Sequence, residues 1–227
     1  MKFIVIEGLD GSGKSTQLKK IKRFFDQKQI PFEYVHFPRT ETPVYGDLIA
    51  RFLRGELGDI NQVNPYLIAL IYAGDRNEAA KTVRSWINEG RYVIVDRYVY
   101  SNIAFQCAKI KKSDEKKALR DWIKNLEYEH NNIPKPDLNL FLDVPFSFTK
   151  RNLTQDRQGE DRDYLQGKKD IHEDSLSFQE NVRNEYLALL EEDPSFLSIK
   201  CSNSNDEILS PDEIFSKIET ELKKIIR

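Results

Sequence analysis

The chain has 227 residues, with 35 Lys and Arg against 37 Asp and Glu residues and a formal net charge of -2. The length favours one domain, and the balanced charge argues against a dedicated nucleic-acid binder, which usually carries a basic excess. Met1-Lys2 leads directly into an apolar segment, and no run approaches the ~18 apolar residues of a membrane span. We therefore expect a cytoplasmic protein with neither nucleic-acid nor membrane partners.

Short apolar segments alternate with helical patterns along the chain, which is typical of a parallel sheet with helices on its faces. The predicted strands are residues 2–6, 33–37, 92–95, 138–142 and 196–200. No internal repeat or low-complexity linker separates them. The sequence therefore predicts a single α/β domain over residues 1–227.

Caps and apolar spacing predict the helices. In the first half, one helix ends before Pro31, a short one covers residues 44–53, and a long one covers residues 64–90. The long helix begins at Asn64-Pro65, a cap followed by proline at the first helical position, and has a weak point at Gly74.

Three later helices are predicted from their first residues. Ser113 is expected to cap one helix, and Pro145 to open the helix after the fourth strand. Ser210 and Glu213 have the spacing of a capping box at the start of the last helix.

Residues 8–15 read Gly-Leu-Asp-Gly-Ser-Gly-Lys-Ser, the pattern of a phosphate-binding loop between a strand and a helix. Glycines let the backbone wrap closely around an anion, and exposed N–H groups hold phosphate oxygens. Lys14 would reach the transferred phosphate, and the Ser15 hydroxyl would ligate Mg²⁺. The predicted ATP-binding residues are Gly8, Leu9, Asp10, Gly11, Ser12, Gly13, Lys14, Ser15 and Thr16.

Charged residues follow the second and third predicted strands, where ligands of open parallel sheets bind. Arg39 comes after Phe37, and its guanidinium suits a second phosphate group, although a surface arginine fits the sequence equally well. Asp96 can hold Mg²⁺ through water. Arg97 can lie between donor and acceptor phosphates and offset the charge that develops during transfer.

Two further patterns indicate a nucleoside as part of the second substrate. Asp10 places a carboxylate in an anion-binding loop, a repulsion that a hydrogen bond from a sugar hydroxyl would offset. Tyr72 and Arg76 are spaced i, i+4 and share a helix face. They can stack on a base and bind its carbonyl edge, or they can be a core tyrosine beside a solvated arginine.

Residues 155–173 are charged, contain two glycines and have almost no apolar face. The segment fits either a solvated loop or a mobile lid that closes over phosphates and excludes water. Because Ser12 adds no charge to the phosphate loop, we expect the lid to supply positive charge through Arg157 and Arg162.

Together these segments resemble the thymidylate kinase family in order and spacing. The matching segments are residues 7–16, 37–39, 72–76, 96–98 with Ser101, 104–106, 136–138 and 142–145. The Asp-Arg-Tyr-x-x-Ser segment, combined with an aspartate in the phosphate loop, is the most specific part. The resemblance implies a three-layer P-loop nucleoside monophosphate kinase fold, with a five-stranded parallel sheet, helices on both faces and a mobile lid.

The same resemblance implies Mg²⁺-dependent transfer of a phosphoryl group from ATP to dTMP. The products are ADP and dTDP, and the dTDP serves dTTP synthesis. The resemblance also implies that the chain forms a homodimer. Arg39 and Arg97 would bind the dTMP phosphate, and Asp10 the deoxyribose 3′-hydroxyl. Phe105 stands where the family usually has tyrosine. An aromatic ring at this position lies near the sugar and disfavours a 2′-hydroxyl. The chain resembles members whose catalytic arginines lie in the lid.

The base would be read by three side chains: Tyr72 stacks on thymine, while Arg76 and Gln106 reach its edge. The full set of dTMP-binding residues implied is Asp10, Phe37, Arg39, Tyr72, Arg76, Arg97, Ser101, Phe105 and Gln106.

Competing functions remain open from the sequence. Another nucleoside monophosphate kinase would use the same residues. A deoxynucleoside kinase needs a carboxylate to activate a neutral 5′-hydroxyl, and Glu7 is the obvious candidate. A nucleotide-dependent switch would have a guanine-reading Asn-Lys-x-Asp motif, which the sequence lacks.

Overall fold

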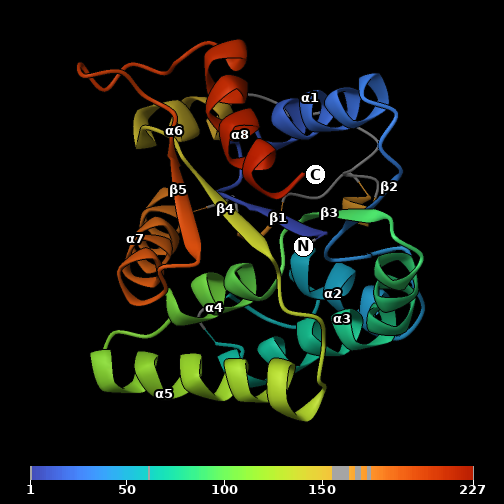
Figure 1. The fold of residues 1–227 in the computed structure, drawn as a ribbon. Helices are drawn as coiled ribbons and strands as arrows, with labels where there is room; N and C mark the ends of the chain where they lie inside the picture. The colour runs from blue at the N-terminus through green and yellow to red at the C-terminus, as the bar shows by residue number, and fades with distance from the viewer. Residues whose placement is uncertain (1, 61, 155–163, 167–169, 173–174, 227) are drawn as a thin grey trace.

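A computed structural model describes residues 2–60, 62–154, 164–166, 170–172 and 175–226. Five parallel strands form one sheet in the order β2-β3-β1-β4-β5 (Figure 1). Their bounds are β1 Phe3–Glu7, β2 Phe32–His36, β3 Tyr92–Asp96, β4 Leu138–Asp143 and β5 Phe196–Lys200. Each predicted strand is confirmed to within one residue at either end, because short apolar runs between breakers mark buried parallel strands clearly.

The helices are α1 Lys14–Gln27, α2 Tyr45–Leu53, α3 Pro65–Asn88, α4 Val99–Cys107, α5 Ser113–Lys124, α6 Phe146–Thr154, α7 Leu176–Glu192 and α8 Pro211–Ile225, with a π-helical turn η1 at Asn125–His130. The Asn64 cap and the Ser210–Glu213 capping box are confirmed. The Ser113 cap is wrong: the helix already includes Ser113, and Lys112 precedes it without a side-chain cap. Helices α4 and α7 were not predicted from the sequence.

Alternation along β1 divides the core into two layers. Phe3 and Val5 pack in a cluster with residues of α3, α4, α5 and α7, whereas Ile4 and Ile6 pack in a cluster with residues of α1 and α8. Figure 1 shows α1 and α8 on one side of the sheet and α3, α4 and α5 on the other. The predicted three-layer α/β fold is therefore confirmed, and the carboxyl ends of β1 and β3 meet at one edge.

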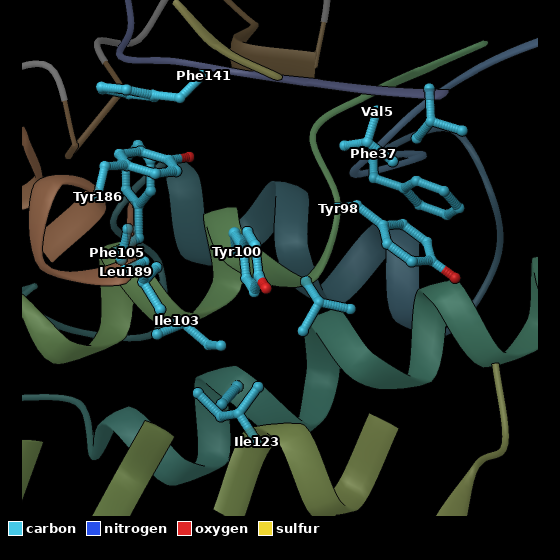
Figure 2. Close-up of a cluster of buried hydrophobic side chains, with 14 of the residues drawn as sticks. Val5, Phe37, Tyr98, Tyr100, Ile103, Phe105, Ile123, Phe141, Tyr186 and Leu189 are labelled. Carbon is cyan, nitrogen blue, oxygen red and sulfur yellow. The ribbon is translucent and has the colours of Figure 1, made fainter. Parts of the chain in front are cut away.

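Aromatic side chains fix the layer that contains α7. Phe141 of β4 stacks on Tyr186 of α7, with ring centroids 4.7 Å apart and planes at 23° (Figure 2). The Tyr186 hydroxyl donates to Glu7 Oε2 at 3.0 Å, which satisfies the polar end of a fully buried ring. The hydrophobic core thus reaches the carboxyl end of β1, where Glu7 lies.

Gly74 lies inside α3, and the helix continues through it to Asn88. A Cβ atom at Gly74 would lie 2.2 Å from Cε1 and 2.4 Å from Cζ of the Tyr45 ring in α2. The glycine thus permits close packing of α2 on α3, and the weak point expected in the helix is not observed.

We expect Gly74→Ala to destabilise the protein by about 1–3 kcal/mol, because the methyl group must displace the Tyr45 ring. This clash opposes the gain of roughly 1 kcal/mol that alanine brings to a helix interior. Urea unfolding of Gly74→Ala in the wild-type and Tyr45→Ala backgrounds measures the coupling. The substitution should become neutral or stabilising without the ring; an equal cost in both backgrounds would contradict the packing argument.

Among the described residues, no helix combines the length and the apolar character needed to cross a membrane.

Candidate active site

Most of the predicted nucleotide-binding residues line one cavity of about 730 Å³. Those that do are Asp10, Gly11, Ser12, Gly13, Lys14, Ser15, Phe37, Arg39, Tyr72, Arg76, Asp96, Arg97, Ser101, Phe105 and Gln106. Gly8, Leu9 and Thr16 of the phosphate loop lie outside this lining. The cavity therefore brings four cations, Lys14 and the arginines at positions 39, 76 and 97, around a single space.

The phosphate loop has the backbone that the glycine pattern predicts. Gly13 has φ +82°, a left-handed conformation that L side chains rarely adopt, and it precedes the first residue of α1. Lys14 Nζ donates to the carbonyls of Gly8 and Leu9 at 3.1 and 3.0 Å. These contacts hold the ammonium across the loop, where the N–H groups of the helix terminus also point.

Arg97 is positioned by the turn that follows β3. Its backbone has φ +64°, and its N–H donates to the Ile6 carbonyl of β1 at 3.0 Å. The guanidinium donates to Asp10 Oδ1 at 2.7 Å and to Ser101 Oγ at 3.3 Å, and lies 5.1 Å from the Phe105 ring centroid. Burial disfavours its charge, but Asp10 and neighbouring acidic groups outweigh burial and raise the Arg97 pKa, so the side chain stays cationic.

Glu7 stabilises this turn through hydrogen bonds. It is fully buried and accepts hydrogen bonds from the N–H groups of Tyr98 and Ser101 at 2.9 and 3.2 Å. Ser101 Oγ, at 2.5 Å, and the Tyr186 hydroxyl donate to its other oxygen. Burial raises the Glu7 pKa despite these bonds. With both oxygens engaged and no place in the cavity lining, Glu7 is unsuited to activating a nucleoside hydroxyl.

Asp96 provides a carboxylate suited to a hydrated cation. His36 Nδ1 lies 3.1 Å from Oδ2, and the buried Oδ1 has no hydrogen-bond partner among the described residues. Burial raises the Asp96 pKa, but the His36 hydrogen bond and the Lys14 charge outweigh it and lower the pKa below its usual value. The described residues contain no cluster of three or more His, Cys, Asp or Glu side chains that could hold a metal. An ion here would therefore need phosphate and water ligands, as Mg²⁺ usually does.

Asp75 orients Arg39, a role that the sequence analysis did not assign. The fully buried Asp75 carboxylate accepts from Arg39 N at 3.0 Å and Nε at 2.8 Å, and its carbonyl accepts from Nη2 at 2.8 Å. Three contacts fix the direction of the Arg39 guanidinium at the cavity wall. The aspartate sits in the Tyr-Ala-Gly-Asp-Arg segment, directly before Arg76.

Arg76 is buried, so the alternative of a solvated arginine is wrong. Its Nε and Nη2 each donate to a Glu127 oxygen at 2.6 Å, and the two side chains are 2% and 0% exposed. Asn102 Nδ2 donates to Glu127 Oε1 at 3.0 Å. Burial lowers the Arg76 pKa, but Glu127 outweighs it and the pKa is raised. Tyr72 also lines the cavity, one helical turn before Arg76.

The predicted lid arginines, Arg157 and Arg162, lie outside the described residues. The described parts of that segment contact the site: the Ile171 N–H donates to the Leu53 carbonyl of α2 at 3.0 Å. Gln179 Nε2 of α7 bridges the His172 carbonyl at 2.9 Å and Asp10 Oδ2 at 3.1 Å. The segment is thus tied both to α2 and to the phosphate loop.

Sequence reasoning missed several cavity residues: Tyr98, Asn102, Tyr164, Asp170 and His172. His172 packs its ring 4.8 Å from that of Phe105, and burial lowers its pKa to about 3, so it is neutral near pH 7. A helical pattern for α7 was present in the buried spacing of Phe178, Val182 and Tyr186. That pattern predicts the helix but not the contact of Gln179 with Asp10, which depends on the tertiary structure.

A sequence-family model described as thymidylate kinase matches residues 6–211 of the chain. A thymidylate kinase from Mycobacterium tuberculosis is 34% identical over 142 residues, which are 63% of this chain and 65% of that protein. A probable thymidylate kinase from Pyrobaculum aerophilum is 31% identical over 100% of this chain and 99% of its own length.

The fold has a solved counterpart. The thymidylate kinase from Candida albicans superposes with a TM-score of 0.73 at 25% identity, covering 98% of this chain and 91% of that chain. Similarity in sequence and in structure therefore extends over nearly the whole chain, including every segment that lines the cavity.

Proposed function

This chain belongs to the thymidylate kinase family, and on that basis we propose that it transfers the γ-phosphoryl group of ATP to dTMP, giving ADP and dTDP. The observation that carries the proposal is the shared cavity of Lys14, Arg39, Arg76 and Arg97. Two anionic nucleotides repel each other strongly, and Lys14, Arg39 and Arg97 in the wall of one cavity can offset that repulsion.

The transfer itself requires positioning and charge stabilisation more than proton removal. The attacking atom is an oxygen of the dTMP phosphate, which is already ionised near neutral pH, so no strong base is needed. Lys14 holds the ATP phosphates, Arg39 holds the dTMP phosphate, and Arg97 lies between them. This assignment agrees with the use of Glu7 as a structural acceptor beneath the site.

Ser15 and Asp96 would hold Mg²⁺, which when bound neutralises charge on the ATP phosphates. Oδ1 of Asp96, which has no hydrogen-bond partner in the described part of the chain, supports this assignment, since a carboxylate oxygen can accept from a metal-bound water. Arg157 and Arg162 would add positive charge from the lid at residues 155–173. Closure of that lid would exclude water from the transferred phosphoryl group.

The nucleoside of dTMP would extend from the phosphates toward α3 and α4. Asp10 would accept from the 3′-hydroxyl, with Phe37, Ser101 and Phe105 around the phosphate and sugar. Tyr72 would stack on thymine, and Arg76 and Gln106 would meet its edge. The pairing of Arg76 with Glu127 supports a base-reading role because it holds the guanidinium in one orientation.

A panel of dTMP, dUMP, UMP, CMP and AMP, each with Mg-ATP, tests the function. The phosphoryl group of ATP should be transferred to dTMP faster than to any other monophosphate of the panel. Thymidine, offered separately, should not be phosphorylated, because Glu7, the candidate base, has both carboxylate oxygens engaged in hydrogen bonds. Slow ATP turnover that no monophosphate accelerates would instead favour a nucleotide-dependent binding module.

We also propose that the chain works as a homodimer through α3. Leu67 and Leu70, which lie one turn apart on this helix, are 59% and 46% exposed, and a second copy would cover them. Light scattering should give the mass of two chains for the wild type and a lower mass for Leu67→Asp.

The single domain, the cytoplasmic location and the lack of nucleic-acid or membrane partners stay predictions.

A further inference from the structure

Gln106 presents one end of its amide to a lysine and lies in the cavity wall. It belongs to α4, is 1% exposed and lines the cavity. Its Oε1 accepts a hydrogen bond from Lys109 Nζ at 2.7 Å. Lys109 follows the end of α4 closely, and its N–H donates to the Gln106 carbonyl at 3.3 Å. The two residues are thus joined through both backbone and side chains.

Lys109 is drawn toward the interior at this point. Its Nζ lies 4.8 Å from the ring centroid of Phe52 in α2, and burial lowers its pKa to about 7. No carboxylate of the described residues forms an ion pair with it, whereas Lys112 on the same connection is exposed and pairs with Glu115 at 2.7 Å. Lys109 is partly buried, and an amine in such a position without an acid is unfavourable, so its hydrogen bond with Gln106 indicates a specific role.

The chemistry of the amide supplies that role. The lysine ammonium offers only donors, so the amide atom that faces it is the oxygen. This contact favours that orientation of the amide over the flipped one and leaves Nε2, with its two hydrogens, available to a ligand. Oε1 retains a second lone pair. Gln106 therefore offers one donor and one acceptor side by side in a defined order.

We propose that Lys109 is a positioning residue for base recognition: it fixes the Gln106 amide so that Nε2 donates to O4 of a pyrimidine while Oε1 accepts from N3–H. This inference rests on the proposed function. Thymine and uracil carry a carbonyl at position 4 and a proton on N3. Cytosine carries an amino group at position 4, a donor that would face the amide donor, and an unprotonated N3 that would face Oε1.

The test compares Lys109→Met with Lys112→Met. Methionine keeps an unbranched stem over Phe52 but removes the donor to Oε1, so the amide can adopt either orientation. Loss of one hydrogen bond of this kind predicts a KM for dTMP that is about 5- to 10-fold higher in Lys109→Met. The kcat should stay within about twofold, and the preference for dTMP over dCMP in kcat/KM should fall by about the same factor. Lys112→Met should match the wild type in all three values.

Lys109→Arg provides the rescue, since a guanidinium also donates to Oε1 and should restore most of the preference for dTMP. Thermal denaturation checks that each variant is folded; if Lys109→Met is not, Lys109→Ala replaces it in the same comparison. A folded Lys109→Met or Lys109→Ala enzyme with wild-type KM and wild-type base preference would overturn the inference alone. A wild-type protein that phosphorylates no nucleoside monophosphate would overturn both this inference and the proposed function.

Discussion

Replacing Arg97 by alanine should lower turnover by about 10²- to 10³-fold while leaving ATP binding within a few-fold of the wild type. The guanidinium is anchored by Asp10 at 2.7 Å and by Ser101 at 3.3 Å, at the cavity wall between the phosphate loop and α4. From that place it can meet charge that develops only during transfer, and such an interaction affects kcat more than ground-state binding.

Steady-state kinetics and direct ATP binding on Arg97→Ala measure the two effects separately. Alanine keeps a side chain at φ +64°, so the backbone cost at this position is nearly unchanged. Arg91→Ala is the matched control, because Arg91 is 44% exposed and pairs with Glu33 and Glu89. Undiminished turnover in Arg97→Ala would remove Arg97 from the catalytic role.

Replacing Glu127 by alanine should destabilise the fold by about 3–5 kcal/mol. Arg76 would then be buried with an uncompensated charge, and Asn102 would lose the carboxylate that accepts from its Nδ2. Breaking one half of a buried pair costs far more than the intact pair contributes, because the remaining charge cannot reach water. The affinity for dTMP should fall as well, since Arg76 loses its fixed orientation.

Urea unfolding of Glu127→Ala and Glu129→Ala provides the comparison. Glu129 pairs with Lys135 at 3.3 Å, but both side chains are about two-thirds exposed, 66% and 65%, so its loss should change stability by no more than about 0.5 kcal/mol. Equal stability of the two variants would show that Arg76 finds another partner when Glu127 is absent.

The two arginines differ in how far the sequence predicts them. Arg97 follows a clear buried strand, so its place at the edge of the sheet could be inferred from the chain itself. Arg76 could be placed on a helix face, but spacing alone allowed a solvated side chain. Its partner is 51 residues away in the π-helical turn η1, and a pairing at that separation leaves no periodic signal.

The two helices that were not predicted, α4 and α7, also differ in how far the sequence could have revealed them. The residues of α4 are all buried, and its polar residues Ser101, Asn102 and Gln106 line the cavity, so the helix lacks the solvent-exposed polar face that makes helical spacing visible. The residues of α7 do show that spacing, and the helix could have been predicted. Its contribution to the site could not, because Gln179 matters only through a bridge between Asp10 and the His172 carbonyl.

The sequence by itself determined the phosphate loop, the five strands and the layered α/β fold, because glycine conformation and apolar periodicity act over a few neighbouring residues. The choice of partners was decided only by the tertiary structure. Asp75 for Arg39, Glu127 for Arg76 and Lys109 for Gln106 are hydrogen-bonded pairs. Such pairs form because burial removes water as the competing partner, and burial is a property of the folded chain.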